Sequence, residues 1–220
     1  MCSSRMHCRA HYNDGSLQWG IYEYDVDFAS LALLCDSSQA EYAVKNFKSE
    51  KRRCEWLAVR AALRILSGCD ADVAYTPEGK PLRVDGKGHI SISHSGCYVA
   101  VALHRDCDVG IDVELRSSRV SAVRGRVLSA VEEDALDREN EAEALLLHWS
   151  AKESFYKIIG NRGGSFVESF RISPFEVEKN GSFDISYIKD GETLRRCAVD
   201  YVVSDDFVFT CCVDAEKQLK

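Results

Sequence analysis

The spacing of apolar and polar residues in the first half of the chain predicts strands around one long helix. Strands alternate apolar and polar side chains with a period of two, whereas helices repeat about every 3.6 residues. Helical spacing runs over about residues 39–67 and ends at Gly68, a common helix stop. Ser95 and Gly96 indicate a tight turn between the last two strands. The predicted strands are 17–26, 89–93 and 97–103.

The second half repeats this order of elements. Helical spacing covers about residues 119–137 and 139–160, and the second helix ends at Gly160. A long helix followed by a meander of strands, found twice, predicts an α+β fold of two similar halves related by pseudo-twofold symmetry. Each half, residues 1–107 and residues 108–220, is expected to be a long helix packed on a small antiparallel sheet. The predicted strands are 108–115, 168–178, 183–188, 196–203 and 206–213.

Charge and composition exclude several classes of function. The 220 residues carry a net charge of −7, which argues against bulk binding to nucleic acids or anionic membranes. The chain lacks a run of about 18 apolar residues, so we expect no transmembrane helix. The first residues include no continuous apolar stretch, so we expect no secretory signal and a cytoplasmic protein.

Cysteine is frequent, with ten residues and no C-x-x-C pair. Several cysteines lie in apolar, strand-like runs, where a free thiol behaves as a small hydrophobic group, and we expect reduced thiols. Cys2, His7, Cys8 and His11 form a possible zinc set. Their spacing matches no common zinc pattern, so a frayed terminus is the preferred interpretation.

Two carboxylates share one face of the predicted strand that contains GIDVE (110–114). Side chains alternate along a strand, so Asp112 and Glu114 point the same way while Ile111 and Val113 point the other. Neighbouring carboxylates repel each other unless a cation lies between them, and oxygen ligands suit a hard divalent cation such as Mg²⁺. The alternative interpretation is an exposed polar face, because D-x-E is a common sequence.

A third carboxylate lies on the predicted helix that contains WSAKESFYK (149–157). At 3.6 residues per turn, Trp149, Glu153 and Lys157 share one stripe. Glu153 is a candidate metal ligand, and Lys157 is placed to meet a phosphate oxygen. The alternative is a surface Glu–Lys pair that contributes only a few tenths of a kcal/mol.

ISHSG (92–96) places Ser93 and His94 at a turn, where hydroxyl, imidazole and backbone N–H groups can bind an anion. A serine hydrolase is disfavoured, because an extended backbone turns the neighbouring serines away from His94 and no G-x-S-x-G elbow is present. The alternative for His94 is a turn residue that bonds its own backbone.

Basic residues gather locally despite the acidic net charge. Residues 45–64 hold seven lysines and arginines against two glutamates. Arg53, Arg60 and Arg64 fall on one helix stripe, and guanidinium groups match phosphate oxygens well, although a solvated helix face is the alternative. Lys80 lies in a turn between two prolines, Pro77 and Pro81, which would hold it in a set position.

Together these features predict a transferase that acts on a phosphate-containing small molecule, with the attacking hydroxyl supplied by a second substrate. The motifs GKP (79–81), ISHSG, GIDVE and WSAKESFYK stand in order within about 80 residues. In this order and spacing they resemble the signature motifs of the larger, surfactin-type class of 4′-phosphopantetheinyl transferases. The resemblance covers roughly residues 50–175.

The resemblance implies an active site in a cleft between the two halves. Enzymes of this family move the phosphopantetheine arm of coenzyme A onto a serine of an apo acyl or peptidyl carrier protein, release adenosine 3′,5′-bisphosphate and need Mg²⁺. Residues 1–107 would contact the coenzyme A phosphates, and residues 108–220 would bind Mg²⁺ and dock the carrier. A cleft that is complete within one chain implies a monomer.

The resemblance also implies roles for individual residues. Mg²⁺ would be held on the pyrophosphate by carboxylates, and Glu153 or a metal-bound water would accept the proton of the serine. Lys157 would stabilise the leaving phosphate, and a docking patch is expected near 162–166, with Phe166 as an anchor. The expected metal ligands are Asp112, Glu114 and Glu153, and the expected coenzyme A contacts are Arg53, Arg60, Lys80, Ser93, His94, Lys152 and Lys157.

Two other classes of function remain open from the sequence. A Mg²⁺-dependent phosphohydrolase or nucleotidyltransferase acting on a coenzyme A-like nucleotide would use the same three carboxylates, but would need no carrier protein. A binding module that has lost its chemistry would be expected to lack one of the carboxylates, and all three are present.

Overall fold

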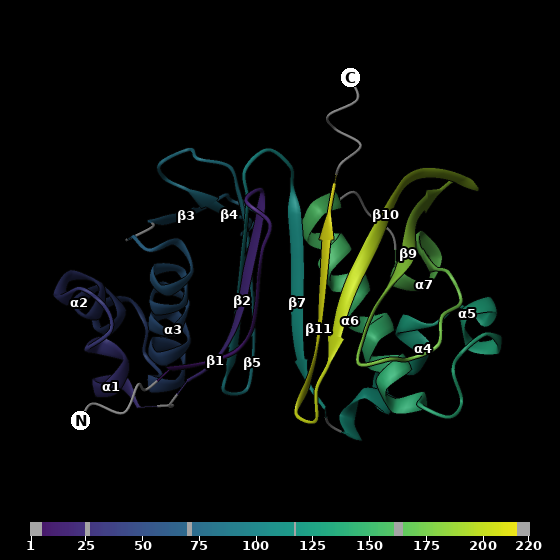
Figure 1. Ribbon diagram of the computed structural model, residues 1–220, viewed down its shortest axis with the longest axis horizontal. Coiled ribbons are helices and arrows are strands. Elements are labelled where there is room, and N and C mark those ends of the chain that lie inside the picture. The colour runs from purple at the N-terminus through teal and green to yellow at the C-terminus, as the bar shows by residue number, and fades with distance from the viewer. Residues whose placement is uncertain (1–5, 25–26, 70–71, 117, 161–164, 215–220) are drawn as a thin grey trace. The chain divides into compact units, whose positions relative to one another are not determined.

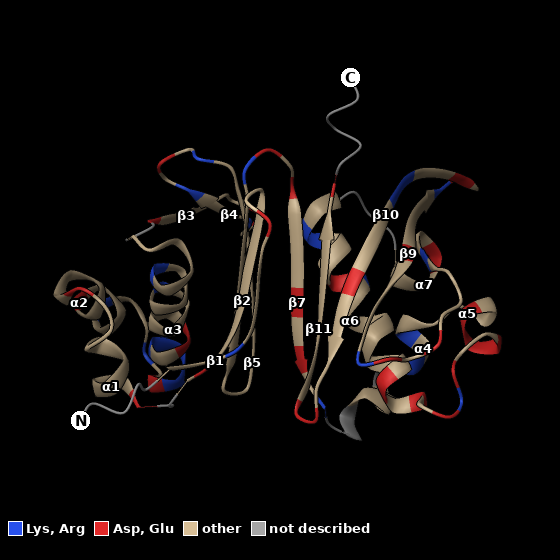
Figure 2. Cartoon of the chain, viewed as in Figure 1, with Lys and Arg blue, Asp and Glu red and all other residues tan. Residues whose placement is uncertain are grey.

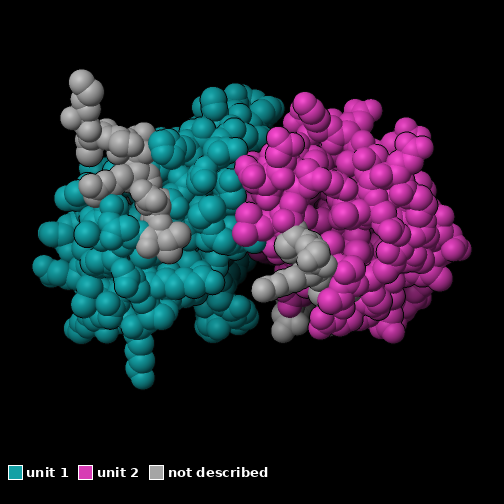
Figure 3. All heavy atoms as spheres, turned by 90° about the horizontal axis from the view of Figure 1, so that it is seen from below, with its two compact units in different colours: residues 1–106 teal, residues 107–220 magenta. Residues whose placement is uncertain are grey.

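The computed structural model describes residues 6–24, 27–69, 72–116, 118–160 and 165–214. The chain divides into two compact units, residues 1–106 and residues 107–220, which Figure 3 draws in different colours. Both units combine helices with antiparallel sheets, so the predicted α+β class is confirmed. Within the described ranges, none of the helices has both the length and the apolar character that crossing a membrane requires.

In its described residues, the first unit contains a four-stranded antiparallel sheet in the order β1-β2-β6-β5, a separate two-stranded sheet and three helices (Figure 1). The longest helix, α3, packs on β6, where Leu57 and Leu63 of the helix and Val99 and Val101 of the strand are fully buried. The elements are β1 (Met6–Asn13), β2 (Leu17–Tyr24), α1 (Phe28–Ala32), α2 (Ser37–Asn46), α3 (Glu50–Ser67), β3 (Val73–Tyr75), β4 (Pro81–Arg83), β5 (His89–Ser95) and β6 (Tyr98–His104).

The predicted helix over residues 39–67 is two helices, α2 and α3. Phe47 adopts an extended backbone conformation and ends α2. Ser49 then starts α3 as an N-cap, because its side chain accepts a hydrogen bond from the backbone N–H of Arg52. The predicted end is confirmed, since Gly68 caps α3 in the left-handed region with φ of 70°.

Residues 6–13 are more ordered than predicted. Residues 6–13 form β1, which pairs with β2 as a hairpin, so the expectation of a frayed terminus is wrong for this segment. Asp14 stabilises the connecting turn, because its Oδ1 accepts hydrogen bonds from the N–H groups of Ser16 (2.8 Å) and Leu17 (2.7 Å). These bonds also hold the pKa of Asp14 below its usual value.

The second unit is a five-stranded antiparallel sheet in the order β7-β11-β10-β9-β8, with the long helix α6 packed on one face. Leu147 and Phe155 of α6 pack into the same core as Ile185 and Val199 of the sheet. The elements are β7 (Val109–Leu115), η1 (Ser118–Val123), α4 (Arg124–Val127), α5 (Ala130–Asp134), α6 (Glu141–Ile159), α7 (Phe166–Ser169), β8 (Phe170–Ile172), β9 (Asn180–Lys189), β10 (Glu192–Val203) and β11 (Phe207–Val213).

Two predicted elements of this unit are wrong in their extent. The helix expected over 119–137 is divided into η1, α4 and α5, because Ser129 starts a new helix through a capping box with Glu132. The strand expected over 168–178 is only β8. Pro174, which has no N–H to donate to a sheet, follows two residues after β8 ends.

Candidate functional site

A close approach of α6 to β7 builds the first part of the site. A Cβ atom on Gly110 would lie 2.0 Å from the backbone oxygen of Ser154, so only glycine lets the helix rest on the strand here. Alternation along β7 then turns Asp112 and Glu114 toward the same helix. Figure 2 marks the acidic positions of β7 in red.

Asp112 is buried and is bound by a cation from α6. Nζ of Lys157 donates to Oδ1 of Asp112 (3.0 Å) and to the backbone oxygen of Ile111 (2.7 Å). Asp112 is 5% exposed, and its charge is therefore balanced locally by Lys157. Lys157 itself keeps partial exposure, which leaves it accessible to a further anion.

Glu114 is held by the indole of Trp149. Nε1 of Trp149 donates to Oε1 of Glu114 at 3.1 Å, and the indole ring packs against Phe166 with ring centroids 5.8 Å apart. Trp149 therefore orients a carboxylate and packs its helix at the same time.

Glu153 lies within electrostatic reach of the other two carboxylates. Burial raises the pKa of Glu153, and the negative charges of Asp112 and Glu114 raise it further, whereas Lys157 opposes them. The structure thus brings the three carboxylates of GIDVE and WSAKESFYK into one electrostatic environment, although they lie about 40 residues apart in the sequence.

The three carboxylates, Asp112, Glu114 and Glu153, are also the candidate metal ligands. Among the residues that the structure describes, no three His, Cys, Asp or Glu side chains form a cluster that is ready to hold a metal ion. Protein donors occupy Asp112 and Glu114 instead. The chemistry of the donor set nevertheless fits a hard divalent cation, since three carboxylates whose mutual repulsion raises a pKa are the groups that such a cation stabilises.

Lys152 lies elsewhere. Its side chain is fully buried, and Nζ donates to Oε2 of Glu132 at 2.8 Å and to the backbone oxygen of Val127 at 2.6 Å. The expected contact with coenzyme A phosphates is therefore corrected, because this ammonium group is paired inside the core of the second unit and does not reach its surface.

In the first unit, the structure places an arginine beside His94 that the sequence analysis missed. Nη1 of Arg52, near the start of α3, lies 3.4 Å from Nε2 of His94 on β5. The same Nη1 donates to Oε2 of Glu55 at 3.0 Å, while the guanidinium keeps most of its exposure. Arg52 and His94 together form a basic surface to which an anion can bind. The available signals were the place of Arg52 in the basic run of residues 45–64 and its position in the first turn of the helix.

Ser93 and Lys80 are two further residues of this unit that were expected to contact coenzyme A. Ser93 is buried and, by strand alternation, lies on the face of β5 opposite to His94. Lys80 ends a tight turn in which its N–H donates to Oγ1 of Thr76 at 3.2 Å. Gly79 allows this turn, with φ of 86°.

Two of the predicted phosphate-binding arginines serve the packing of α3. The guanidinium of Arg60 is 8% exposed and lies 3.7 Å from the ring centroid of Trp56, a cation–π contact, and burial lowers its pKa. Nε of Arg53 donates to the backbone oxygen of Phe47 at 2.8 Å. The expected direct role of Arg60 in phosphate binding is therefore corrected, because an aromatic ring covers its charge.

The predicted docking patch is partly visible. Arg162, Gly163 and Gly164 lie outside the described residues, whereas Phe166 is half-buried at the start of α7. Its ring packs against Trp149, Tyr156 and Phe170.

Comparison with known proteins adds independent information. Residues 108–212 match the 4′-phosphopantetheinyl transferase superfamily. The chain is 26% identical over 145 residues to 4′-phosphopantetheinyl transferase AcpT of Salmonella typhimurium, a match that covers 64% of this chain and 76% of that protein. It is 31% identical over 142 residues to AcpT of Escherichia coli O157:H7 (62% and 70%) and 29% identical over 117 residues to AcpT of Salmonella typhi (52% and 61%).

Proposed function

This chain belongs to the 4′-phosphopantetheinyl transferase superfamily, and we propose that it transfers the 4′-phosphopantetheine arm of coenzyme A to a serine of an apo acyl or peptidyl carrier protein. The other product is adenosine 3′,5′-bisphosphate. The observation that carries the proposal is the set of three carboxylates and Lys157 that forms where α6 rests on β7. We expect a monomeric, cytoplasmic enzyme of the holo-[acyl-carrier-protein] synthase type.

The two units are proposed to be halves related by pseudo-twofold symmetry. In support, each unit has one long helix, α3 or α6, packed on an antiparallel sheet. The first half would bind the coenzyme A phosphates, and the second would supply the carboxylates and the surface that meets the carrier protein.

Magnesium is proposed as the cofactor. Asp112, Glu114 and Glu153 would hold it, and when bound it would neutralise charge on the pyrophosphate of coenzyme A. Burial is the main cause of the raised pKa of Glu153, and the negative charges of Asp112 and Glu114 raise it further, which supports this ligand set because a cation would offset that repulsion.

In the proposed reaction, the serine oxygen of the carrier attacks the β-phosphorus of coenzyme A. A new O–P bond forms, the P–O bond to the departing nucleotide breaks, and the carboxylate of Glu153 takes the serine proton. The position of Glu153 supports this role, because it lies within electrostatic reach of Lys157 and of the other two carboxylates. The ammonium of Lys157 would stabilise the charge on the departing phosphate.

Coenzyme A phosphates are proposed to bind the basic surface formed by Arg52 and His94. The 3.4 Å approach of their side chains supports a shared anion contact. Lys80, Ser93 and Arg53 remain proposed contacts to the nucleotide part of coenzyme A.

Mass spectrometry of an apo carrier protein incubated with coenzyme A, Mg²⁺ and this protein tests the function. We expect the carrier to gain one phosphopantetheine group, and EDTA to abolish the gain. Hydrolysis of coenzyme A without any carrier would instead favour a phosphohydrolase. Bound coenzyme A with no gain across several carrier types would favour a binding module.

Arg52→Ala is expected to raise the KM for coenzyme A about tenfold, since loss of a charge-assisted contact costs about 1.5 kcal/mol. Steady-state kinetics at saturating carrier protein measure the change. Arg9→Ala is the matched control, because Arg9 is an exposed arginine of the same unit and pairs with Glu23 at 2.8 Å. An equal rise in KM for both variants would refute a specific role for Arg52.

A further inference from the structure

A buried ion pair in the second unit has a geometry that stability alone does not explain. The side chains of Lys152 and Glu132 are 0% and 1% exposed. Transfer of two charges from water into a protein core is costly, and apolar replacements of similar volume are often as stable. The pair therefore calls for a role other than stability.

Lys152 connects three separate segments to α6. Its three N–H donors reach the backbone oxygen of Val127 (2.6 Å), Oε2 of Glu132 (2.8 Å) and the backbone oxygen of Phe166 (3.3 Å). Val127 ends α4, Glu132 lies in α5, and Phe166 begins α7. One ammonium group thus sets the distance of all three segments from the helix that carries Glu153 and Lys157.

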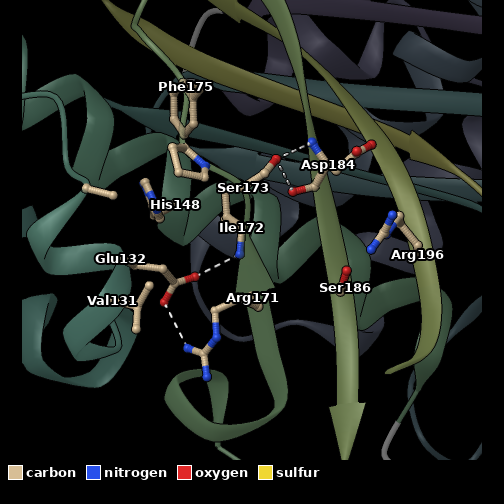
Figure 4. A pocket seen from close by; sticks show the side chains of 12 residues that line it. Val131, Glu132, His148, Arg171, Ile172, Ser173, Phe175, Asp184, Ser186 and Arg196 are labelled. Atoms are coloured by element: carbon tan, nitrogen blue, oxygen red, sulfur yellow. Dashed lines mark hydrogen bonds and ion pairs between the residues drawn. The ribbon is translucent and has the colours of Figure 1, made fainter. Parts of the chain in front are cut away.

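The carboxylate of Glu132, the partner of Lys152, accepts further hydrogen bonds from Ser129 and Ile172. Its Oε2 accepts hydrogen bonds from the N–H (2.9 Å) and the hydroxyl (2.8 Å) of Ser129, and its Oε1 accepts one from the N–H of Ile172 (2.9 Å). Glu132 lines a pocket of about 350 Å³. Figure 4 shows Arg171 facing the carboxylate, and its Nη1 lies 3.6 Å from Oε2. Both ends of the α7–β8 segment are therefore tied to one ion pair.

The segment held in this way contributes Phe166 to an aromatic wall, whose other two rings, Trp149 and Tyr156, belong to α6. The ring of Phe166 lies 5.8 Å from each of the other two rings, measured between centroids. Trp149 donates to Glu114, so the wall is directly connected to a proposed metal ligand. Movement of Phe166 would therefore change the surface next to the reacting groups.

We propose that Lys152 and Glu132 are a positioning pair that holds the aromatic wall in place for the acceptor carrier protein. The pair acts through Phe166 and touches neither substrate. This inference rests on the proposed function. It assigns Lys152, a residue of the WSAKESFYK motif, to recognition of the second substrate and not to coenzyme A.

The double variant Lys152→Met with Glu132→Gln tests the pair. It removes both charges together, so no unpaired charge is left in the core, and glutamine keeps an oxygen for the N–H of Ile172. We expect the KM for the carrier protein to rise about tenfold, with the KM for coenzyme A within about twofold of wild type. We also expect faster amide hydrogen exchange in residues 165–172 and unchanged exchange in α3.

Arg138→Met with Glu141→Gln is the matched control, because it removes an exposed ion pair of the same unit (2.8 Å) by the same substitutions. The control should change neither the KM for the carrier protein, nor the KM for coenzyme A, nor amide hydrogen exchange in residues 165–172. Unchanged exchange in residues 165–172 of the test variant overturns the positioning role, even if wild type shows no transfer and the proposed function fails. Faster exchange with an unchanged carrier KM overturns the link to the carrier. A rise in the KM for coenzyme A, with an unchanged KM for the carrier protein, would show that Lys152 contributes to nucleotide binding and would overturn the proposal.

Discussion

Glu153→Gln is expected to lower the rate of phosphopantetheine transfer by a factor of about 10²–10⁴, the range that a general base contributes. The amide has nearly the same shape, but it cannot accept the serine proton and is a poorer ligand for a hard cation. Stability should not fall, because the pKa of Glu153 is raised by burial and by Asp112 and Glu114, so the neutral side chain relieves repulsion at pH 7. Mass spectrometry measures the rate, and thermal melting followed by circular dichroism measures stability.

The matched control for this experiment is Glu139→Gln. Glu139 is an exposed carboxylate of the same unit and lies two residues before α6 begins. Its transfer rate should equal that of wild type. A Glu153→Gln variant that retains the wild-type rate would show that Glu153 neither takes the proton nor holds the metal. A variant that loses activity and melts at a much lower temperature would point to a structural role instead.

Gly110→Ala is expected to lower the free energy of unfolding by about 3 kcal/mol, the upper part of the usual cost of overpacking. The added Cβ would lie 2.0 Å from the backbone oxygen of Ser154, and a helix backbone cannot move aside as a side chain can. For a protein of this length, the melting temperature should fall by about 6–12 °C. Transfer should also slow, because displacement of α6 moves Glu153 and Lys157 relative to β7.

Gly125→Ala separates this packing effect from the general effect of replacing glycine. Gly125 is exposed in α4, and a Cβ atom built there meets no atom within 4 Å. Its replacement should leave stability unchanged or raise it by up to about 1 kcal/mol, because alanine restricts the unfolded chain. Equal melting temperatures for wild type and Gly110→Ala would mean that α6 does not rest on β7 at this position.

Local sequence rules predicted one side of the site well. Alternation along GIDVE placed Asp112 and Glu114 on one face, and the structure turns both toward α6. Helical periodicity placed Trp149 and Lys157 on one stripe, and these two residues contact the two carboxylates. Such rules succeed here because period and face follow from backbone geometry alone.

The same rules failed for cations whose surroundings come from distant segments. Lys152 and Lys157 are five residues apart on one helix, yet one is fully buried and the other partly exposed. The segments that cover Lys152 are α4, α5 and α7, and no local pattern reports their packing. Arg60 was similarly selected for its stripe, although Trp56 covers its guanidinium.

By itself, the sequence determined the α+β class, most strands of the two larger sheets and the C-terminal ends of the two long helices, and it selected the three carboxylates proposed to carry the chemistry, because these follow from periodicity, capping and motif spacing. Only the tertiary structure decided which basic groups are buried and which groups they pair with. Lys152 is buried in an ion pair with Glu132, and Arg52 lies beside His94. The physical reason is that burial and pairing of a charge depend on segments remote in the chain, whose packing sets both its solvation and its partner.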